Sequence, residues 1–144
     1  MAKKFSQEIG LQEGDFLAAT PIFECLAHTS KTIHGMLLGS APENRASALV
    51  NETMVGRYSE EHIAALKNHY GLTDKQLQFF TVDAIADQEH TAMARKLIAK
   101  HATSEHQRKL VREAAAHMVR FKIAKFQAYI TPTRDKEWGV GILE

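Results

Sequence analysis

The sequence has little of what would hold a disulfide-stapled or membrane-bound protein together. It contains one cysteine and three prolines among 144 residues. The single Cys25 cannot form an internal disulfide, so we expect it to be a small packed side chain. No apolar stretch approaches the roughly 20 residues that span a membrane, and the N-terminus lacks the hydrophobic segment of a signal peptide. We therefore expect a cytoplasmic protein that makes no contact with a membrane.

A surplus of charge of either sign is missing as well. The chain has 18 Lys and Arg against 17 Asp and Glu, which gives a formal net charge of +1. The longest basic run is the pair Lys3–Lys4, whereas domains that bind nucleic acid carry a basic face. We therefore expect no nucleic-acid partner. Histidine, in contrast, is frequent, with eight residues, and directs attention to metal or proton chemistry.

Alternation typical of strands is also absent, and most glycines and prolines fall at the ends of apolar segments. The pattern predicts an all-α fold, a bundle of about five helices in a single domain that covers residues 1–144. A short N-terminal segment, 1–13, and an irregular tail, 131–144, flank the bundle. The expected helices run from Thr20–Pro21 to Gly39, from Pro42 to about Val55, from Ser59 to Tyr70, from Thr73 to His101, and from Ser104 to the Thr131–Pro132 pair.

The fourth expected helix, residues 73–101, carries three chemically active side chains on an apolar face. Asp83, Asp87 and His90 follow one another at spacings of four and three residues, so they share this face. Burying two unpaired carboxylates a turn apart would cost several kcal/mol, so a proton, a cation or a metal has to compensate. Carboxylates and one imidazole inside a helix bundle are typical of Fe or Mn sites. Glu52, on the core side of the second expected helix, is our candidate for a further ligand.

The same spacing allows a purely structural explanation. Asp83 and Asp87 then pair with Lys or Arg at the edge of the apolar face, and His90 is a hydrogen-bonded core histidine. His117 and Lys122 have a similar ambiguity on the apolar face of the last helix. Lys122 either extends its ammonium to water or binds an anion, and His117 is either a packed core residue or a proton-transfer group.

A second set of metal-binding side chains is weaker. Glu24 and His28 lie one turn apart on the first expected helix and share a face. His34 lies well round the helix from both. We expect this set to be less suited to a metal than the face with Asp83.

Five blocks of the sequence, and more loosely the tail, carry a family resemblance. They are DFLAATPIF (15–23), NETMVGRYS (51–59), HIAALKNHYG (62–71), FFTVDAIADQEH (79–90), VRFK (119–122) and, in the tail, TRDKEW (133–138). Through these blocks the chain resembles the C-terminal half of the haem-oxygenase-like-fold family, which includes CADD-like diiron proteins, the quinone synthase PqqC and TenA. The resemblance implies half of a haem-oxygenase-like bundle, with the CADD-like branch closest.

The resemblance also implies a metal and its ligands. In the CADD-like branch the fourth block reads His, three residues, Asp, two residues, His, and these residues bind iron. Position for position this implies Asp83, Asp87 and His90, with Asp83 in place of the usual His. Glu52 lies where that branch carries a bridging glutamate. The implied cofactor is therefore iron, in a centre that is dinuclear in that branch, held by Glu52, Asp83, Asp87 and His90.

The resemblance covers only part of the family's bundle. The family has about 80 further N-terminal residues, whose helices supply another Glu and His to the metal. A bundle without them exposes an apolar face, which is rarely left in water. We therefore expect a homodimer, or a complex with a separate N-terminal subunit. In a symmetric dimer the helix at 73–101 faces its mate, and the site contains two copies of the same residues.

Three functions remain open at this point. The first is an iron-dependent oxidase or oxygenase acting on a small metabolite, in which His117 or Lys122 handles a proton or an anionic substrate. The second is a PqqC-like or TenA-like protein that binds a small molecule without a cofactor, through His90 and Lys122, which match residues of the PqqC pocket. The third is a truncated, non-catalytic relative that acts as an oligomeric interaction module. The fold alone does not identify a substrate.

Overall fold

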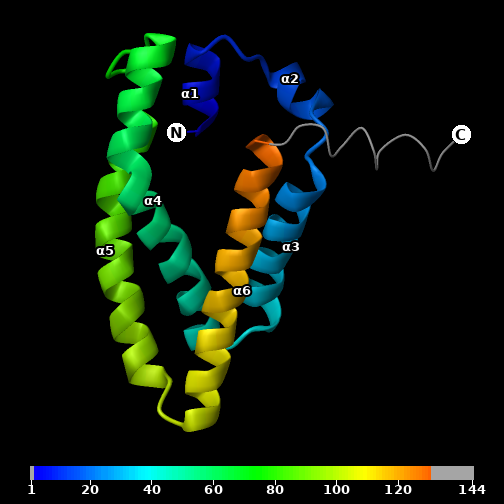
Figure 1. Ribbon diagram of the computed structural model, residues 1–144, viewed down its shortest axis with the longest axis vertical. Helices are drawn as coiled ribbons and strands as arrows, with labels where there is room; N and C mark the ends of the chain where they lie inside the picture. The colour runs from blue at the N-terminus through cyan, green and yellow to red at the C-terminus, as the bar shows by residue number, and fades with distance from the viewer. Residues whose placement is uncertain (1, 131–144) are drawn as a thin grey trace, which may run out of the picture.

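The computed structural model describes residues 2–130 as a bundle of helices (Figure 1). Between these residues the structure has no strand, so the predicted all-α class is confirmed. The predicted tail at 131–144, with Trp138, lies outside the described residues. Two short helices precede four long ones. The helices are α1 (Ala2–Glu8), α2 (Glu13–Ala18), α3 (Phe23–Leu38), α4 (Ala41–Tyr70), α5 (Gln78–His101) and α6 (Glu105–Ile130).

Local sequence signals explain most helix ends. The Ser40 hydroxyl and the Glu43 carboxylate form a capping box at the start of α4. At its other end Gly71 adopts the left-handed conformation, with φ of 66°, that ends many helices. Before α6, the backbone amide of Ser104 donates to the Gln107 side chain at 3.0 Å. These ends agree with the predicted boundaries at residues 40–42, 71 and 104.

Three predicted boundaries are wrong. Helix α5 begins at Gln78 and not at Thr73, because residues 74–77 form a turn. We expected one helix to end near Val55 and another to begin at Ser59, but α4 continues through both. The Ser59 side chain does not cap a helix, because its hydroxyl donates to the carbonyl of Val55 one turn earlier. A serine in this position satisfies its own hydroxyl without breaking the helix. Residues 2–8 and 13–18, for which the sequence predicted no helix, are also helical.

The four long helices are arranged with α4 at the centre. Helix α4 packs against α5 along one side and against α6 on another, and α3 packs mainly against α6. Figure 1 shows α5 and α6 diverging toward the end of the bundle where α4 ends. On the outer side, the Cys25 sulfur of α3 lies 2.9 Å from the Tyr129 hydroxyl of α6. Cys25 is thus a half-buried contact residue between two helices, as its expected packing role requires.

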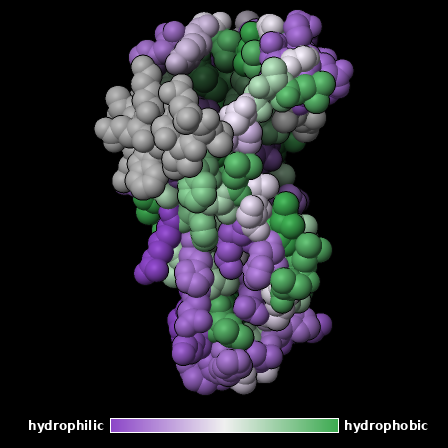
Figure 2. Space-filling view, turned by 90° about the vertical axis from the view of Figure 1, so that its right-hand side faces the viewer, coloured by the Kyte–Doolittle hydropathy of each residue, from purple (hydrophilic) through white to green (hydrophobic). Residues whose placement is uncertain are grey.

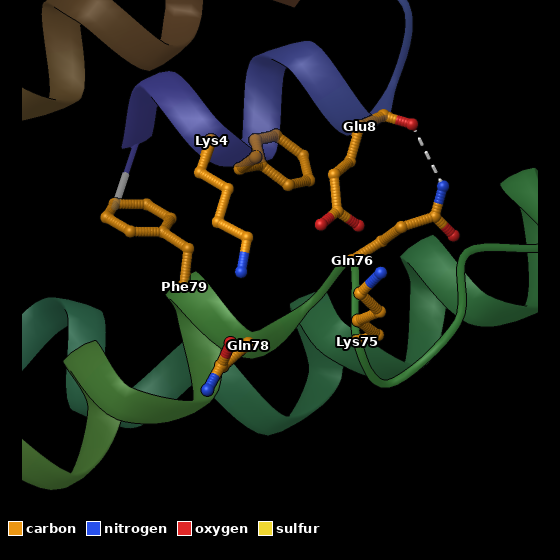
Figure 3. A pocket seen from close by; sticks show the side chains of 7 residues that line it. Lys4, Glu8, Lys75, Gln76, Gln78 and Phe79 are labelled. Carbon is orange, nitrogen blue, oxygen red and sulfur yellow. Dashed lines mark hydrogen bonds between the residues drawn. The ribbon is translucent and has the colours of Figure 1, made fainter.

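Helix α1 docks on the chain that leads into α5 (Figure 3). The ring of Phe5 lies edge-on to that of Phe80, with 4.9 Å between centroids. The side-chain amide of Gln76 donates to the carbonyl of Glu8 at 3.1 Å. The hollow between these segments measures about 20 Å³, which is room for about one water molecule. It is therefore too small to hold a metabolite.

The core is small, and much apolar surface is exposed. The buried apolar residues are mainly alanines, together with Leu77 and Met118. On α3, large side chains point outward: Phe23, Met36, Leu37 and Leu38 are 65% to 76% exposed. Figure 2, viewed from the right-hand side of Figure 1 where α3 lies, shows hydrophobic side chains gathered in patches. In the described part of the chain, no helix is both long enough and apolar enough to cross a membrane.

Candidate metal centre

Three side chains from two helices converge in the structure. Glu52 comes from α4, and Asp87 and His90 come from successive turns of α5. The Nδ1 atom of His90 lies 3.8 Å from the Glu52 Oε1 atom and 3.9 Å from the Asp87 Oδ1 atom. One ligand atom from each residue lies within 4.8 Å of the others. The contact between α4 and α5 therefore brings together three of the four ligands expected from the sequence.

Burial destabilises the charged forms of the Glu52 and Asp87 carboxylates. The Asp87 side chain is 10% exposed and that of Glu52 is 18% exposed. The Glu52 Oε2 atom is buried and has no hydrogen-bond partner among the described residues. Burial, together with the charge of Asp83, raises the pKa of both carboxyl groups. The free protein therefore holds two crowded acids whose charges favour a bound cation.

The same arrangement fits a transition-metal ion. The distances from His90 to both carboxylates exceed a hydrogen bond, so these groups do not satisfy one another. An ion such as zinc binds imidazole nitrogen and carboxylate oxygen at about 2.0–2.2 Å. One ion can therefore bridge the 3.8 Å and 3.9 Å that separate the His90 Nδ1 atom from the two carboxylate oxygens. Two carboxylates and one imidazole also match the donor preference of iron. His90 is 56% exposed, which leaves the group open on one side.

Asp83 does not join this group, although we expected it among the ligands. It lies on α5, one turn before Asp87, and its side chain lines a cavity instead. Its charge reaches the group electrostatically, because it raises the pKa of both Glu52 and Asp87. That Asp83 is a metal ligand stays a prediction, because Asp83 is not among the three residues that converge.

A cavity of about 530 Å³ lies beside the three ligands, between α4, α5 and α6. It begins one turn from the ligands on both helices, since Val55 follows Glu52 by three residues and Asp83 precedes Asp87 by four. This volume is in the range that holds a small metabolite. The lining residues are Met54, Val55, Tyr58, Ser59, His62, Phe79, Phe80, Asp83, Phe126 and Ile130.

Lys122 is buried, with 1% of its surface exposed, so it does not extend to water as one interpretation expected. Its ammonium donates hydrogen bonds to the backbone carbonyl of Asn51 at 2.9 Å and to the Asn51 side-chain oxygen at 2.7 Å. Burial lowers the pKa of Lys122 to about 8. Both bonds go to Asn51, so in the structure Lys122 holds α6 against α4. Its expected contact with a substrate stays a prediction.

The other predicted residues lie apart from the three ligands. His117 is exposed on α6, so the expectation that it packs in the core is wrong. Its role in proton transfer stays a prediction. On α3, His28 is half-buried, and its Nε2 atom has no hydrogen-bond partner among the described residues. It joins no metal-binding group with Glu24 or His34 within residues 2–130.

Sequence reasoning missed two residues that matter to the site. Asn51 holds the buried lysine, and a lysine predicted on an apolar face was the signal that a partner was needed. Tyr58 faces the cavity, and burial, with the charges of Asp87 and Asp83, raises the pKa of its hydroxyl. In the sequence, the only indication of this role was that Tyr58 follows the candidate ligand Glu52 by one to two helical turns.

One comparison with known proteins identifies the family of the chain. The chain belongs to a family of iron-containing redox enzymes, which it matches over residues 1–122. The match includes all three converging ligands. No curated protein and no solved structure shows significant similarity to the chain.

Proposed function

We propose that the protein is an iron-dependent oxidoreductase, of the CADD-like and PqqC-like group, that acts on a small metabolite. The observation that carries this proposal is the convergence of Glu52, Asp87 and His90, with a buried Glu52 oxygen that has no hydrogen-bond partner. Membership in a family of iron-containing redox enzymes supports iron as the metal. Iron supplies one-electron chemistry with dioxygen, which ordinary side chains do not provide.

The residues around the ligands have distinct tasks in this proposal. Glu52 and Asp87 bring negative charge to the ion, and the exposed side of His90 leaves room for dioxygen or substrate. Lys122 fixes Asn51 and thereby the turn of α4 that carries Glu52. The Tyr58 hydroxyl carries its proton at neutral pH and can donate a hydrogen bond to a bound molecule; its raised pKa extends this to more alkaline pH.

Uptake of dioxygen tests this function. Protein loaded with Fe(II) should consume dioxygen faster, in the presence of a reductant, than the same amount of Fe(II) with the Glu52→Gln variant. An oxygen electrode measures both rates. Glu89→Gln removes an exposed carboxylate from α5, the helix that carries Asp87 and His90. It is the control and should behave like the unchanged protein. Equal rates for all three proteins would contradict an iron-dependent oxidoreductase.

We also propose that a second copy of the chain covers the open side of the site. Val82, Ile85 and Met93 on α5 are 40% to 61% exposed, and Met93 lies within one turn of His90. With the exposed side chains of α3, they form more apolar surface than small soluble domains usually leave in water. Sedimentation velocity should therefore show a dimer, and Met93→Lys should weaken it. A monomer at every concentration would leave a separate N-terminal subunit as the covering partner.

The cavity favours a second candidate function, a small-molecule-binding protein without a metal. In that case iron binding is absent, and ligands still stabilise the fold. A dimer that binds neither iron nor ligand would instead favour a non-catalytic interaction module.

A further inference from the structure

The walls of the large cavity combine aromatic rings with a single carboxylate. Tyr58 and Phe126 meet edge to face, with 5.9 Å between centroids. His62 and Phe80 meet in the same way at 5.1 Å. Among the described residues that line the cavity, Asp83 is the only one with a full charge. The cavity therefore offers apolar surface, ring faces and one negative charge.

We propose that this cavity binds an organic cation: a primary or secondary amine attached to an aromatic or aliphatic body. An ammonium group can pair with the Asp83 carboxylate and lie against a ring face, while the apolar body fills the remaining volume. A neutral molecule of the same shape leaves Asp83 without a partner, and a carboxylate is repelled by it. The combination thus selects the sign of the ligand's charge.

Two lysines lie behind the ring walls of the cavity. The ammonium of Lys122 lies 5.7 Å from the centre of the Tyr58 ring, and that of Lys125 lies 5.4 Å from the centre of the Phe126 ring. Neither lysine lines the cavity among the described residues, so neither offers an anion a partner at its wall. The Tyr58 and Phe126 rings already contact ammonium groups of the chain. A ligand's ammonium is therefore expected at the Asp83 carboxylate and not at these two rings.

The position of Asp83 gives the inference a functional meaning. It deepens the proposed function, because it assigns a substrate class to the cavity beside the candidate iron ligands. Asp83 precedes the ligand Asp87 by one turn of α5, so an amine held at Asp83 lies about one helical turn, roughly 5.4 Å along the axis, from the metal group. Asp83 then acts on the substrate rather than as a fourth ligand.

Three probes that share an indole ring and a two-carbon side chain test the inference on the full-length protein. They are tryptamine, the neutral alcohol tryptophol, and the anion indole-3-propionate. Binding is followed by changes in protein amide NMR signals, with chelator present so that no metal contributes. The pH is about 8, where ordinary histidines are mostly neutral. Because no iron is involved, failure of the iron proposal does not affect the result.

Tryptamine should bind about tenfold more tightly than either other probe, as one ion pair with a ring contact allows. Asp83→Asn should reduce this preference to within about twofold, whereas the control Glu89→Gln should keep it. Circular dichroism confirms that both variants fold. Equal binding of the three probes, no binding of tryptamine, or an unchanged preference in Asp83→Asn would overturn the inference.

Discussion

The Lys122 ammonium donates hydrogen bonds to both carbonyl oxygens of Asn51, at 2.9 Å and 2.7 Å. These bonds tie the middle of α6 to α4 at the residue before Glu52. A buried ammonium is stable only when its desolvation is offset, and two oxygens of one residue provide that here. The metal group and the buried lysine are thus joined through one turn of α4.

Replacing Lys122 by methionine should destabilise the fold, although methionine has a similar volume. The two oxygens of Asn51 lose their partner in a buried position, and an unpaired buried polar group costs about 1–3 kcal/mol. Urea denaturation measures the free energy of unfolding. Lys109→Met, at an exposed pair with Glu113, is the control and should change it by less than about 0.5 kcal/mol. Similar values for both variants would contradict the structural role of Lys122.

Alkaline pH should reveal the same buried lysine. Its pKa is about 8 in the folded chain, below the ordinary 10.5, so both states are protonated below pH 8. Between these values the unfolded chain binds more protons than the folded one, so this group makes the fold more stable as pH rises. The stability gap between the unchanged protein and Lys122→Met should widen by about 2–3 kcal/mol across this range. A constant gap would contradict the burial of the ammonium.

Asp87→Asn should stabilise the metal-free protein. The pKa of Asp87 is raised above its ordinary 3.8, so the charged form weakens the fold at neutral pH. Removing the charge should raise the free energy of unfolding by roughly 1 kcal/mol at pH 7, as functional sites often trade stability for activity. The difference should shrink as pH falls and vanish only well below pH 3.8, where the acid is protonated in both states. A less stable variant at pH 7 would argue that Asp87 is structural.

A pair of glycine substitutions tests the continuity of α4. Gly56 lies inside the helix, and an added Cβ would meet nothing within 4 Å. Gly56→Ala should therefore raise stability by about 0.5–1 kcal/mol. Gly71→Ala should lower it by about 1 kcal/mol or more, because Gly71 has a φ of 66°. Thermal denaturation compares the two. A destabilising Gly56→Ala would favour the helix break that the sequence predicted.

The sequence predicted the fold class and most helix ends because capping residues act locally. The Ser104 and Gln107 pair starts a helix, and Gly71 ends one, through contacts with their immediate neighbours in the sequence. The predicted break between Val55 and Ser59 was wrong for a tertiary reason. Packing of α4 against both α5 and α6 keeps the helix continuous despite a glycine at 56 and a serine at 59. Intrinsic propensity is a weak signal where packing decides.

The site was partly predictable for similar reasons. Helix periodicity placed Asp87 and His90 on one face, and the neighbours of Glu52 placed it toward the core. Periodicity gives the direction of a side chain to within about one helix face, so it did not separate Asp83 from the ligands. The partner of Lys122 is 71 positions away, and only the packing of α6 against α4 reveals it.

Anaerobic titration with Fe(II) tests the central claim most directly. After removal of unbound metal, the protein should retain at least about 0.5 iron per chain, as a site of two carboxylates and an imidazole can hold. Glu52→Gln, Asp87→Asn and His90→Ala should each lose most of it, while Glu89→Gln should not. Retention below about 0.2 iron per chain by the unchanged protein, or equal retention by the three ligand variants, would contradict an iron centre at these residues.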